Sequence, residues 1–356
     1  MNVHENYMKK AIELAIKGRG YVSPNPIVGC VVVKNGVIIG EGYHQEYGKN
    51  HAEVNALNNC VQDPSGSSLY VTLEPCNHFG KTPPCTDFII KNGIRDVYIS
   101  MLDPNPNMSG KSIEILKMAG INVQTRILEQ ETKYLNRFYC KWICKKIPYV
   151  IAKVAEDRRG FIAKSKFSVW ITGNKSKKNV HKLRSESDAI LVGKNTVLYD
   201  NPELTVRMVY GRNPKRIILD TNRTLPQNLK VFQDPSSKTI VACNDKLFGN
   251  SKTSNCQYLA TKEKNGKIDV NDLLIKLGEL GITSLILEGG SKTIKSFLIE
   301  ELIDEFHLYS SDKKLDELDI KNPFSADENW EFESEQKFDS DNLMIYRKKE
   351  KCLQES

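Results

Sequence analysis

The chain has 356 residues, of which 40% are apolar and 27% charged, and 51 Lys and Arg against 44 Asp and Glu give a formal net charge of +7. This length predicts two domains with cores of their own, and the composition excludes an intrinsically disordered protein. No run approaches 18 apolar residues, which excludes a membrane-spanning helix, and the first residues lack the pattern of a secretory signal. We therefore expect a cytoplasmic protein whose nine cysteines stay reduced.

The positive charge is spread evenly along the chain. Residues 1–147 carry 17 Lys and Arg against 13 Asp and Glu, and the remainder carries 34 against 31. A nucleic-acid-binding domain would concentrate its basic residues on one face or in one segment. We therefore expect neither nucleic acid nor a membrane as a partner.

The first half alternates between helical and extended patterns. Apolar spacing predicts a helix over 5–18, and Asn35-Gly36 predicts a tight turn between strands at 27–33 and 37–39. The pattern then predicts, in order, a helix at 51–57, a strand at 69–73, a helix at 86–92, a strand at 97–100, a helix at 111–119 and a strand at 121–125. A further helix should end at about 146–148. This order favours a three-layer α/β/α domain over residues 1–147, with the boundary near Pro148.

The second half, residues 148–356, has the pattern of another α/β domain. Strands are predicted at 149–154, 189–192, 216–219, 239–242 and 284–287, with helices at 175–185, 270–280 and 291–300. The Gly-x-Gly-x-x-Gly motif of a Rossmann dinucleotide site does not occur. Glu288-Gly289-Gly290-Ser291 follows a strand and precedes a helix, which suits phosphate binding, although such turns are common in proteins without a nucleotide.

The densest chemistry lies between residues 51 and 85, where His51-Ala52-Glu53 is followed by Pro75-Cys76 and by Cys85. Zinc prefers nitrogen and thiolate ligands, and a catalytic zinc keeps one position open for water. His51, Cys76 and Cys85 supply three such ligands, and Glu53 can transfer a proton without binding the metal. The pattern is typical of zinc deaminases, except that eight residues rather than two separate the cysteines. We predict one catalytic zinc, with Glu53 as the proton shuttle.

Two other interpretations of this cluster stay open at the level of sequence. A structural zinc site would need a fourth protein ligand, for which His78 and His44 are the candidates. The cysteines could instead be buried and inert. Glu53 favours the catalytic interpretation, because neither alternative needs it.

Five motifs extend this pattern through the first half: Pro24-Asn25-Pro26, Val28-Gly29-Cys30, His51-Ala52-Glu53, the segment EPCNHFGKTPPC from Glu74 to Cys85, and Asp103-Pro104-Asn105-Pro106. Together they resemble the deaminase half of the bifunctional riboflavin-biosynthesis deaminase–reductases. The resemblance implies a cytidine-deaminase-like fold that removes the 2-amino group of 2,5-diamino-6-ribosylamino-4(3H)-pyrimidinone 5′-phosphate. The positions that match the family's substrate pocket are Asn25, His44, His78, Lys81, Asp103 and Asn105. Each could otherwise be an ordinary polar loop residue. Lys81 stands where the family usually has arginine, and it still offers a cation to the substrate phosphate.

Motifs in the second half are similar, in order, to the reductase half of the same family. They are Lys153-x-Ala155, Ser168-x-Trp170-Ile171-Thr172, His181-x-Leu183-Arg184, Asp188-Ala189-Ile190, Thr196-Val197, Asp200-Asn201-Pro202, Leu204-Thr205-Val206-Arg207 and Glu288-Gly289-Gly290. The resemblance implies a dihydrofolate-reductase-like fold that uses NADPH to reduce the ribosyl group to ribityl. The residues it assigns to the nucleotide are Ala155, Trp170, Thr196, Asp200, Thr221, Gly290 and Ser291. Those it assigns to the substrate are Ser168, Arg184, Leu204, Arg207 and Glu288. The alternatives are surface ion pairs for the arginines and core packing for Trp170.

The second half also departs from the family pattern. Asp157-Arg158-Arg159-Gly160 replaces a Ser-x-Asp-Gly segment, so that Arg159 reverses an expected negative charge, and Lys166 replaces a glycine. Tyr309-Ser310-Ser311-Asp312 replaces a more apolar stretch. The alternative to a bifunctional enzyme is therefore a deaminase whose reductase-like half has lost hydride transfer. A nucleic-acid base deaminase and a non-catalytic zinc module are the other classes considered. We also expect a homo-oligomer, either a dimer or a tetramer.

Overall fold

The computed structural model describes residues 2–78, 83–106, 108–165, 167, 169–247 and 256–349. The chain divides into two compact units, Met1–Lys146 and Ile147–Ser356, one residue away from the boundary expected from the sequence. In the described ranges, none of the helices has the length and apolar character that crossing a membrane would require.

Unit 1 is built on a five-stranded sheet with the order β2-β1-β3-β4-β5. The β1–β2 and β1–β3 pairs are antiparallel, whereas β3, β4 and β5 run parallel. In chain order, the elements are α1 (Val3–Ile16), β1 (Gly29–Lys34), β2 (Val37–Tyr43), α2 (Ala52–Asn58), β3 (Ser68–Leu73), α3 (Cys85–Lys91), β4 (Asp96–Met101), α4 (Lys111–Met118), β5 (Asn122–Thr125), α5 (Glu129–Leu135) and α6 (Arg137–Lys145). The turn between β1 and β2 has positive φ at both Asn35 and Gly36, as the sequence predicts.

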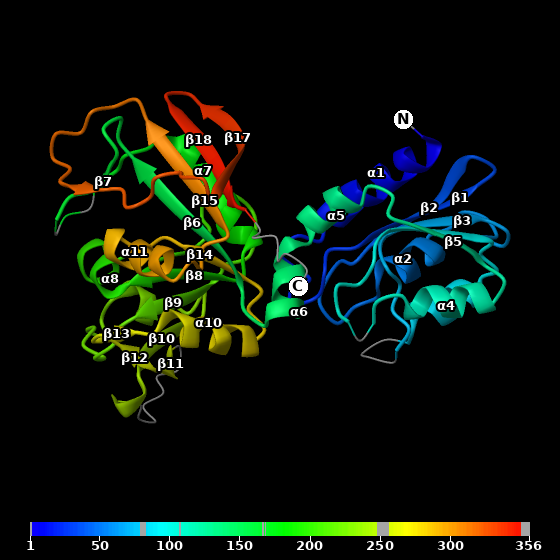
Figure 1. Ribbon diagram of the computed structural model, residues 1–356, viewed down its shortest axis with the longest axis horizontal. Coiled ribbons are helices and arrows are strands. Elements are labelled where there is room, and N and C mark those ends of the chain that lie inside the picture. Colours follow the sequence, from blue (N-terminus) through cyan, green and yellow to red (C-terminus); the bar gives the residue numbers. More distant parts are fainter. Residues whose placement is uncertain are drawn as a thin grey trace. The chain divides into compact units, whose positions relative to one another are not determined.

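The sheet of unit 1 is covered on both faces. Along β1, Val31 and Val33 pack with α1 on one face, whereas Cys30 and Val32 pack with α2, α3 and α4 on the other. Figure 1 shows α1 and α5 on one side of this sheet and α2 and α4 on the opposite side. The three-layer α/β/α architecture predicted from the sequence is confirmed.

Two close approaches between backbones fix the helices against this sheet. A Cβ atom on Gly29 of β1 would lie 2.0 Å from the Ala11 carbonyl oxygen of α1, and one on Gly42 of β2 would lie 2.3 Å from the Ala56 nitrogen of α2. Only glycine permits such contacts. The second of them sets the position of α2, whose first turn carries Glu53 and is preceded by His51.

Unit 2 contains a nine-stranded sheet with the order β11-β10-β9-β8-β14-β6-β15-β18-β17. The seven strands from β11 to β15 are parallel, and the antiparallel strands β18 and β17 complete one edge. The elements are β6 (Tyr149–Glu156), β7 (Phe161–Ala163), α7 (Asn174–Glu186), β8 (Ala189–Gly193), α8 (Lys194–Asp200), β9 (Lys215–Leu219), α9 (Lys230–Gln233), β10 (Thr239–Asn244), η1 (Asp245–Leu247), β11 (Cys256–Thr261), β12 (Glu263–Lys264), β13 (Lys267–Ile268), α10 (Val270–Glu279), β14 (Ser284–Leu287), α11 (Ser291–Ile299), β15 (Glu305–Ser311), β16 (Ile320–Lys321), β17 (Trp330–Phe338) and β18 (Asp341–Lys348).

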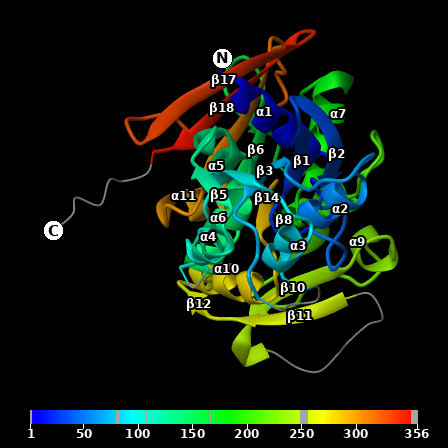
Figure 2. The same ribbon diagram turned by 90° about the vertical axis from the view of Figure 1, so that its right-hand side faces the viewer.

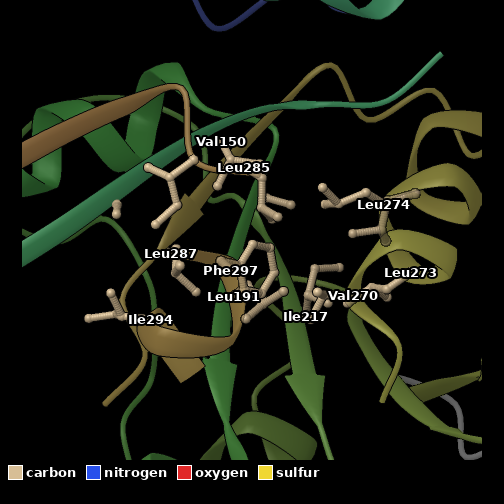
Figure 3. Packing of buried hydrophobic residues seen from close by; sticks show 14 of the residues in the cluster. Val150, Leu191, Ile217, Val270, Leu273, Leu274, Leu285, Leu287, Ile294 and Phe297 are labelled. Carbon is tan, nitrogen blue, oxygen red and sulfur yellow. The ribbon is translucent and has the colours of Figure 1, made fainter. Parts of the chain in front are cut away.

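The largest core of unit 2 lies between this sheet and the helices α10 and α11. Figure 3 shows Phe297 of α11 among Leu191, Leu285 and Leu287, which come from the neighbouring strands β8 and β14. The opposite face of β8 packs against α8 and α9 through a second cluster. Because the central parallel strands are covered on both faces, they read in the sequence as continuous apolar runs.

Four strands of this sheet are not predicted from the sequence: β11, β17 and β18 lie at or next to its edges, whereas β15 is a buried strand between β6 and β18. β17 and β18 form a hairpin that Figures 1 and 2 show in red, and most residues of β17 are exposed. A solvent-exposed edge strand needs no apolar face, so its sequence lacks the pattern that marks a buried strand. The short strands β7, β12, β13 and β16 likewise carry too few residues to show a period.

Candidate functional site

Three side chains of unit 1 form a cluster with the ligand chemistry of zinc. The Nδ1 atom of His51 lies 3.4 Å from the Sγ atom of Cys76 and 3.3 Å from that of Cys85, and all three ligand atoms lie within 4.8 Å of one another. Nitrogen and sulfur ligands of one tetrahedral zinc ion are about 3.6 Å apart. The predicted ligands therefore lie together at the spacing that this ion requires.

Local structure explains why these side chains are available. His51 is the N-cap residue of α2, yet its side chain makes no capping hydrogen bond. Cys76 lies three residues after β3, and Cys85 begins α3 and donates its backbone N–H to the Cys76 Sγ atom over 3.3 Å. Hydrogen bonds from Cys85 and from His51 lower the pKa of Cys76, which favours the thiolate that a metal binds.

Glu53 lies on the first turn of α2, beside the cluster, and is 3% exposed. Burial raises the pKa of its carboxyl group, and the nearby His51 opposes that effect. Glu53 is not a member of the ligand cluster itself. It is placed to exchange a proton with a molecule bound next to the metal ligands.

The cluster opens into a cavity of about 420 Å³. The residues that line this cavity are Pro24, Asn25, Pro26, Val28, His44, Tyr47, Gly48, Lys49, His51, Glu53, Leu73, Glu74, Cys76, His78, Asp103, Asn105, Met108, Tyr139, Trp142 and Ile143. Five of the six residues predicted for the substrate pocket are among them. The sixth, Lys81, lies outside the described residues. Within the described chain, the ligand cluster has three members, so neither His44 nor His78 supplies the fourth ligand of a structural zinc site.

Buried hydrogen bonds set the polarity of one wall of the cavity. The Nδ1 atom of His44 lies 3.0 Å from the Asn50 carbonyl oxygen, so it carries the proton, and the Nε2 atom accepts from the Asn25 amide over 3.1 Å. Burial lowers the pKa of His44, which keeps this ring neutral. The Asn25 amide is thereby oriented with its nitrogen toward His44, which leaves its oxygen as an acceptor for a ligand.

A second wall comes from the segment after β4 and from α6. The Oδ1 atom of Asp103 accepts the Asn105 backbone N–H over 2.9 Å and the Tyr139 hydroxyl over 3.2 Å. Burial raises the pKa of Asp103. Together with Trp142 and Ile143, Tyr139 forms a surface of α6 that the sequence analysis misses. Their helical spacing was the available signal, but the same spacing is typical of an ordinary core-facing helix.

In unit 2, two of the predicted substrate residues pair with each other. The Arg184 guanidinium donates to both carboxylate oxygens of Glu288, over 2.7 and 3.0 Å, and Lys153 lies 3.0 Å from the same carboxylate. Burial alone would raise the pKa of Glu288, but the charges of Arg184 and Lys153 outweigh it and lower the pKa. Arg184 also donates to the Thr205 carbonyl oxygen. This pair is buried, so the surface ion pair considered for Arg184 is wrong.

The loop that carries Leu204 and Arg207 is held by side chains from the body of unit 2. Leu204 is buried and has a φ of 55°. His181 of α7 accepts the Arg207 backbone N–H over 3.0 Å, and Arg216 of β9 donates to the Glu203 carbonyl oxygen over 2.8 Å. The Arg207 side chain is half exposed and pairs with Glu203. Hydrogen bonds thus hold the backbone of this loop, while the charged end of Arg207 stays accessible to solvent.

Most of the predicted nucleotide residues lie at one edge of the sheet of unit 2. Ala155 lies near the end of β6, and Thr196 and Asp200 lie on α8, directly after β8. Thr221 follows β9, and Gly290 and Ser291 begin α11 after β14. Since β9, β8, β14 and β6 are adjacent and parallel, their carboxyl ends meet at the same edge.

The predictions for Trp170 and Ser168 of unit 2 have different outcomes. Trp170 is 75% exposed, with the Lys177 ammonium 3.9 Å from its ring centroid, so core packing is the wrong interpretation of this side chain. Ser168 lies outside the described residues, as does Lys166.

The charge reversal at Arg159 is neutralised within its own turn. The Arg159 guanidinium donates to the Asp157 carboxylate over 3.0 Å and to the Leu315 carbonyl oxygen over 2.7 Å. Asp157 also accepts the backbone N–H groups of Arg159 and Phe161. Burial would raise the pKa of Asp157, but these hydrogen bonds lower it to about 2. An acid two residues earlier therefore balances the arginine.

Fold and site together define the class of this protein: a zinc-dependent deaminase unit joined in one chain to a reductase-type α/β unit. Residues 1–101 match the family described as the cytidine and deoxycytidylate deaminase zinc-binding region, and residues 148–341 match the RibD C-terminal domain. The chain belongs to the RibD family of riboflavin biosynthesis proteins, and it is a bifunctional enzyme.

Individual relatives agree with this assignment. The riboflavin biosynthesis protein RibD of Aquifex aeolicus is 44% identical over 323 residues, which cover 88% of each chain. The solved structure of a diaminohydroxyphosphoribosylaminopyrimidine deaminase/5-amino-6-(5-phosphoribosylamino)uracil reductase from Thermotoga maritima is 38% identical. It has a TM-score of 0.87, with 97% of this chain and 99% of that chain covered. A RibD structure from Acinetobacter baumannii is 32% identical, with a TM-score of 0.88 and coverage of 98% and 99%.

Proposed function

We propose that this chain catalyses two consecutive reactions on one phosphorylated pyrimidine. Unit 1 hydrolyses the 2-amino group of 2,5-diamino-6-ribosylamino-4(3H)-pyrimidinone 5′-phosphate, releasing ammonia, and unit 2 reduces the ribosyl side chain of the product to ribityl. The observation that carries the proposal is the His51, Cys76 and Cys85 cluster, which lies beside the buried Glu53 at the wall of a cavity. Membership of the RibD family supports both reactions.

In unit 1, His51, Cys76 and Cys85 would hold the zinc ion, which supplies Lewis-acid activation of water when it is bound. Glu53 takes up the proton that this activation releases and returns it to the departing nitrogen of the substrate. The acceptor oxygen of Asn25 and the groups of the Asp103 segment orient the pyrimidine ring.

In unit 2, NADPH supplies the hydride when it is bound, and Ala155, Trp170, Thr196, Asp200, Thr221, Gly290 and Ser291 would hold it. The Arg184–Glu288–Lys153 group lies at the carboxyl end of β14, at the same sheet edge. Each nitrogen of the Arg184 guanidinium already has a protein partner. Arg207 is therefore the better of the two arginines for the substrate phosphate, since its side chain is half exposed and its exposed pair with Glu203 is weak.

The alternative, a deaminase that has lost hydride transfer, has less support. One of the three departures from the family pattern behind it is Arg159, whose charge is balanced by Asp157. Family membership over residues 148–341 also favours two active units. We further propose that the enzyme acts in the cytoplasm and that it forms a homo-oligomer. Light scattering of the purified chain measures its mass and so tests the oligomeric state.

The proposal is tested by supplying the diamino substrate to the zinc-loaded protein in two stages. Without NADPH, we expect one equivalent of ammonia per substrate and no further change. After NADPH is added, one equivalent should be oxidised, as followed by the loss of nicotinamide absorbance. Failure to release ammonia would refute the deaminase assignment, and ammonia release without NADPH oxidation would support the deaminase-only alternative.

A further inference from the structure

One buried carboxylate in unit 1 has a larger role than its place in the sequence motif indicates. Glu74 follows β3 directly and is 5% exposed. Among the residues that the structure describes, four hydrogen bonds reach its carboxylate, and their donors all lie between β4 and the first turn of α4. The donors are the Asp103 backbone N–H (3.2 Å), the Gly110 backbone N–H (3.0 Å), the Ser112 backbone N–H (3.2 Å) and the Ser112 hydroxyl (2.7 Å).

These contacts replace a cap that the sequence of α4 does not provide. The N-cap residue of α4 is Gly110, which has a φ of 82° and no side chain to accept the first N–H groups of the helix. Such N–H groups need acceptors, and a negative charge at this end of a helix is favourable. Glu74 supplies both from another element. The N-terminus of α4 is therefore capped by a residue that is distant in the sequence, and loss of this cap would leave buried N–H donors unsatisfied.

The held segment is one wall of the cavity. Asp103, Asn105 and Met108 all line the cavity, and each lies between two points that Glu74 holds, Asp103 N–H and Gly110 N–H. Glu74 itself lies two residues before Cys76, one of the predicted zinc ligands. A single side chain thus fixes the distance between the metal ligand and the wall that faces it.

We propose that Glu74 is a positioning residue for substrate binding in the deaminase reaction: by holding Asp103, Gly110 and Ser112, it keeps the cavity-lining residues Asp103, Asn105 and Met108 where they contact the pyrimidine, without touching the substrate's reacting atoms. This inference rests on the proposed deaminase function of unit 1. It predicts that loss of Glu74 weakens substrate binding, because the wall loosens, while zinc binding and the chemical step are preserved.

Glu74→Gln is the test variant, because it keeps the size of the side chain and turns one acceptor oxygen into an NH₂ donor that faces backbone N–H groups. We expect the KM of deamination to rise by about tenfold or more, corresponding to the loss of one or two buried hydrogen bonds. The kcat should change less than about threefold, and zinc content and the reductase rate of the same chain should not change. Hydrogen exchange should accelerate at the Asp103, Gly110 and Ser112 amides.

Asp96→Asn is the matched control. Asp96 begins β4 at the end remote from the cavity and accepts from Ser68, Arg95 and Asn122 through its carboxylate. This variant also removes a partly buried charge from unit 1, so an equal rise of KM in both variants would show general loosening of the unit and overturn the proposal. A second variant, Ser112→Ala, removes only the 2.7 Å hydrogen bond and should raise KM in the same direction by about two- to threefold.

Substrate binding measured by calorimetry separates this inference from the proposed function. The Glu53→Gln variant should bind the diamino substrate without turnover. Adding Glu74→Gln to this variant should raise the Kd for the substrate by about tenfold. An unchanged Kd would overturn the positioning role, whether or not zinc is retained. If the wild-type chain bound the substrate but released no ammonia, the deaminase function would fail while the Kd comparison still decided the role of Glu74.

Discussion

Arg216 provides the most demanding test of how unit 2 is built. Its side chain is fully buried, and it donates to the carbonyl oxygens of Glu203 (2.8 Å), Asp234 (2.9 Å) and Ser237 (3.0 Å), with a longer contact to Val231 (3.4 Å). It also pairs with the Asp234 carboxylate. One arginine therefore ties the loop before Leu204 to the segment that follows α9.

The variant Arg216→Met keeps an unbranched apolar stem but removes every donor. Each buried acceptor left without a partner costs about 1–3 kcal/mol, and breaking a buried ion pair costs about 3–5 kcal/mol. Asp234 is partly exposed and can be rehydrated, so we expect the free energy of unfolding of unit 2 to fall by about 4 kcal/mol. With an m-value of about 2–3 kcal/mol/M in urea, the midpoint should fall by about 1.5 M.

The assay follows the urea midpoint of reductase activity, with deaminase activity of the same chain as the internal reference. Because Glu203 adjoins Leu204, we also expect a higher KM for the deaminated substrate and an unchanged KM for NADPH. Arg347→Met is the control, since Arg347 pairs with Glu333 at 3.5 Å and is 40% exposed, so its loss should cost less than about 1 kcal/mol. Equal midpoint shifts in the two variants would refute the assignment of Arg216 as a central tie.

Four further predictions concern the two sites. Cys85→Ala should lose zinc and deamination while it keeps reduction, as metal analysis and the two activity assays will show; retained zinc would remove Cys85 from the ligand set. Glu53→Gln should retain zinc and lower the kcat of deamination by about 10²–10⁴, and a near-normal rate would exclude it as the proton shuttle. Tyr139→Phe removes the hydroxyl that donates to Asp103 and should raise the KM of deamination by less than about tenfold; a change confined to kcat would contradict its place in the pocket wall. Burial and the charges of nearby arginines lower the pKa of His181 to about 4 from an ordinary value of 6.5, so between these values the unfolded chain takes up a proton that the folded chain does not, and unit 2 should lose about 2 kcal/mol as the pH falls from 7 to 5. Urea unfolding of unit 2 at pH 7 and pH 5 measures this loss, and a His181→Gln variant that kept the full pH dependence would show that another group causes it.

Much of the site in unit 1 was predictable because its chemistry is encoded locally. His51-Ala52-Glu53 lies at the start of a helix, and Pro75-Cys76 follows a strand. The types of these residues and their spacing were therefore enough to predict the zinc ligands. The α/β/α layers were predicted from the order of helical and extended patterns along the chain, and in the structure successive residues of β1 face opposite cores.

What the sequence could not indicate depends on contacts between distant segments. Glu74 accepts from residues about thirty positions later, and no local pattern marks such a cap. Arg184 and Glu288 are separated by 104 positions and were each expected to contact substrate, whereas the structure pairs them with each other. The exposed strand β17 was missed because nothing in its sequence needs to be apolar.

The departures from the family pattern show the same limit. From the sequence, Arg159 is a positive charge where the family pattern has a negative one. In the folded chain it returns to Asp157, two residues earlier, and to the carbonyl of Leu315. A substitution that reverses a charge can therefore be balanced by a neighbour whose role becomes visible only when the turn is formed.

Whether each unit carries one of two consecutive reactions is decided by NADPH oxidation in the Glu53→Gln variant with two different substrates. We expect no oxidation with the diamino substrate and a wild-type rate with the deaminated product, because only the first unit is disabled. Oxidation of NADPH with the diamino substrate at the wild-type rate would contradict this expectation, since the variant would then still deaminate or the second unit would not require deamination.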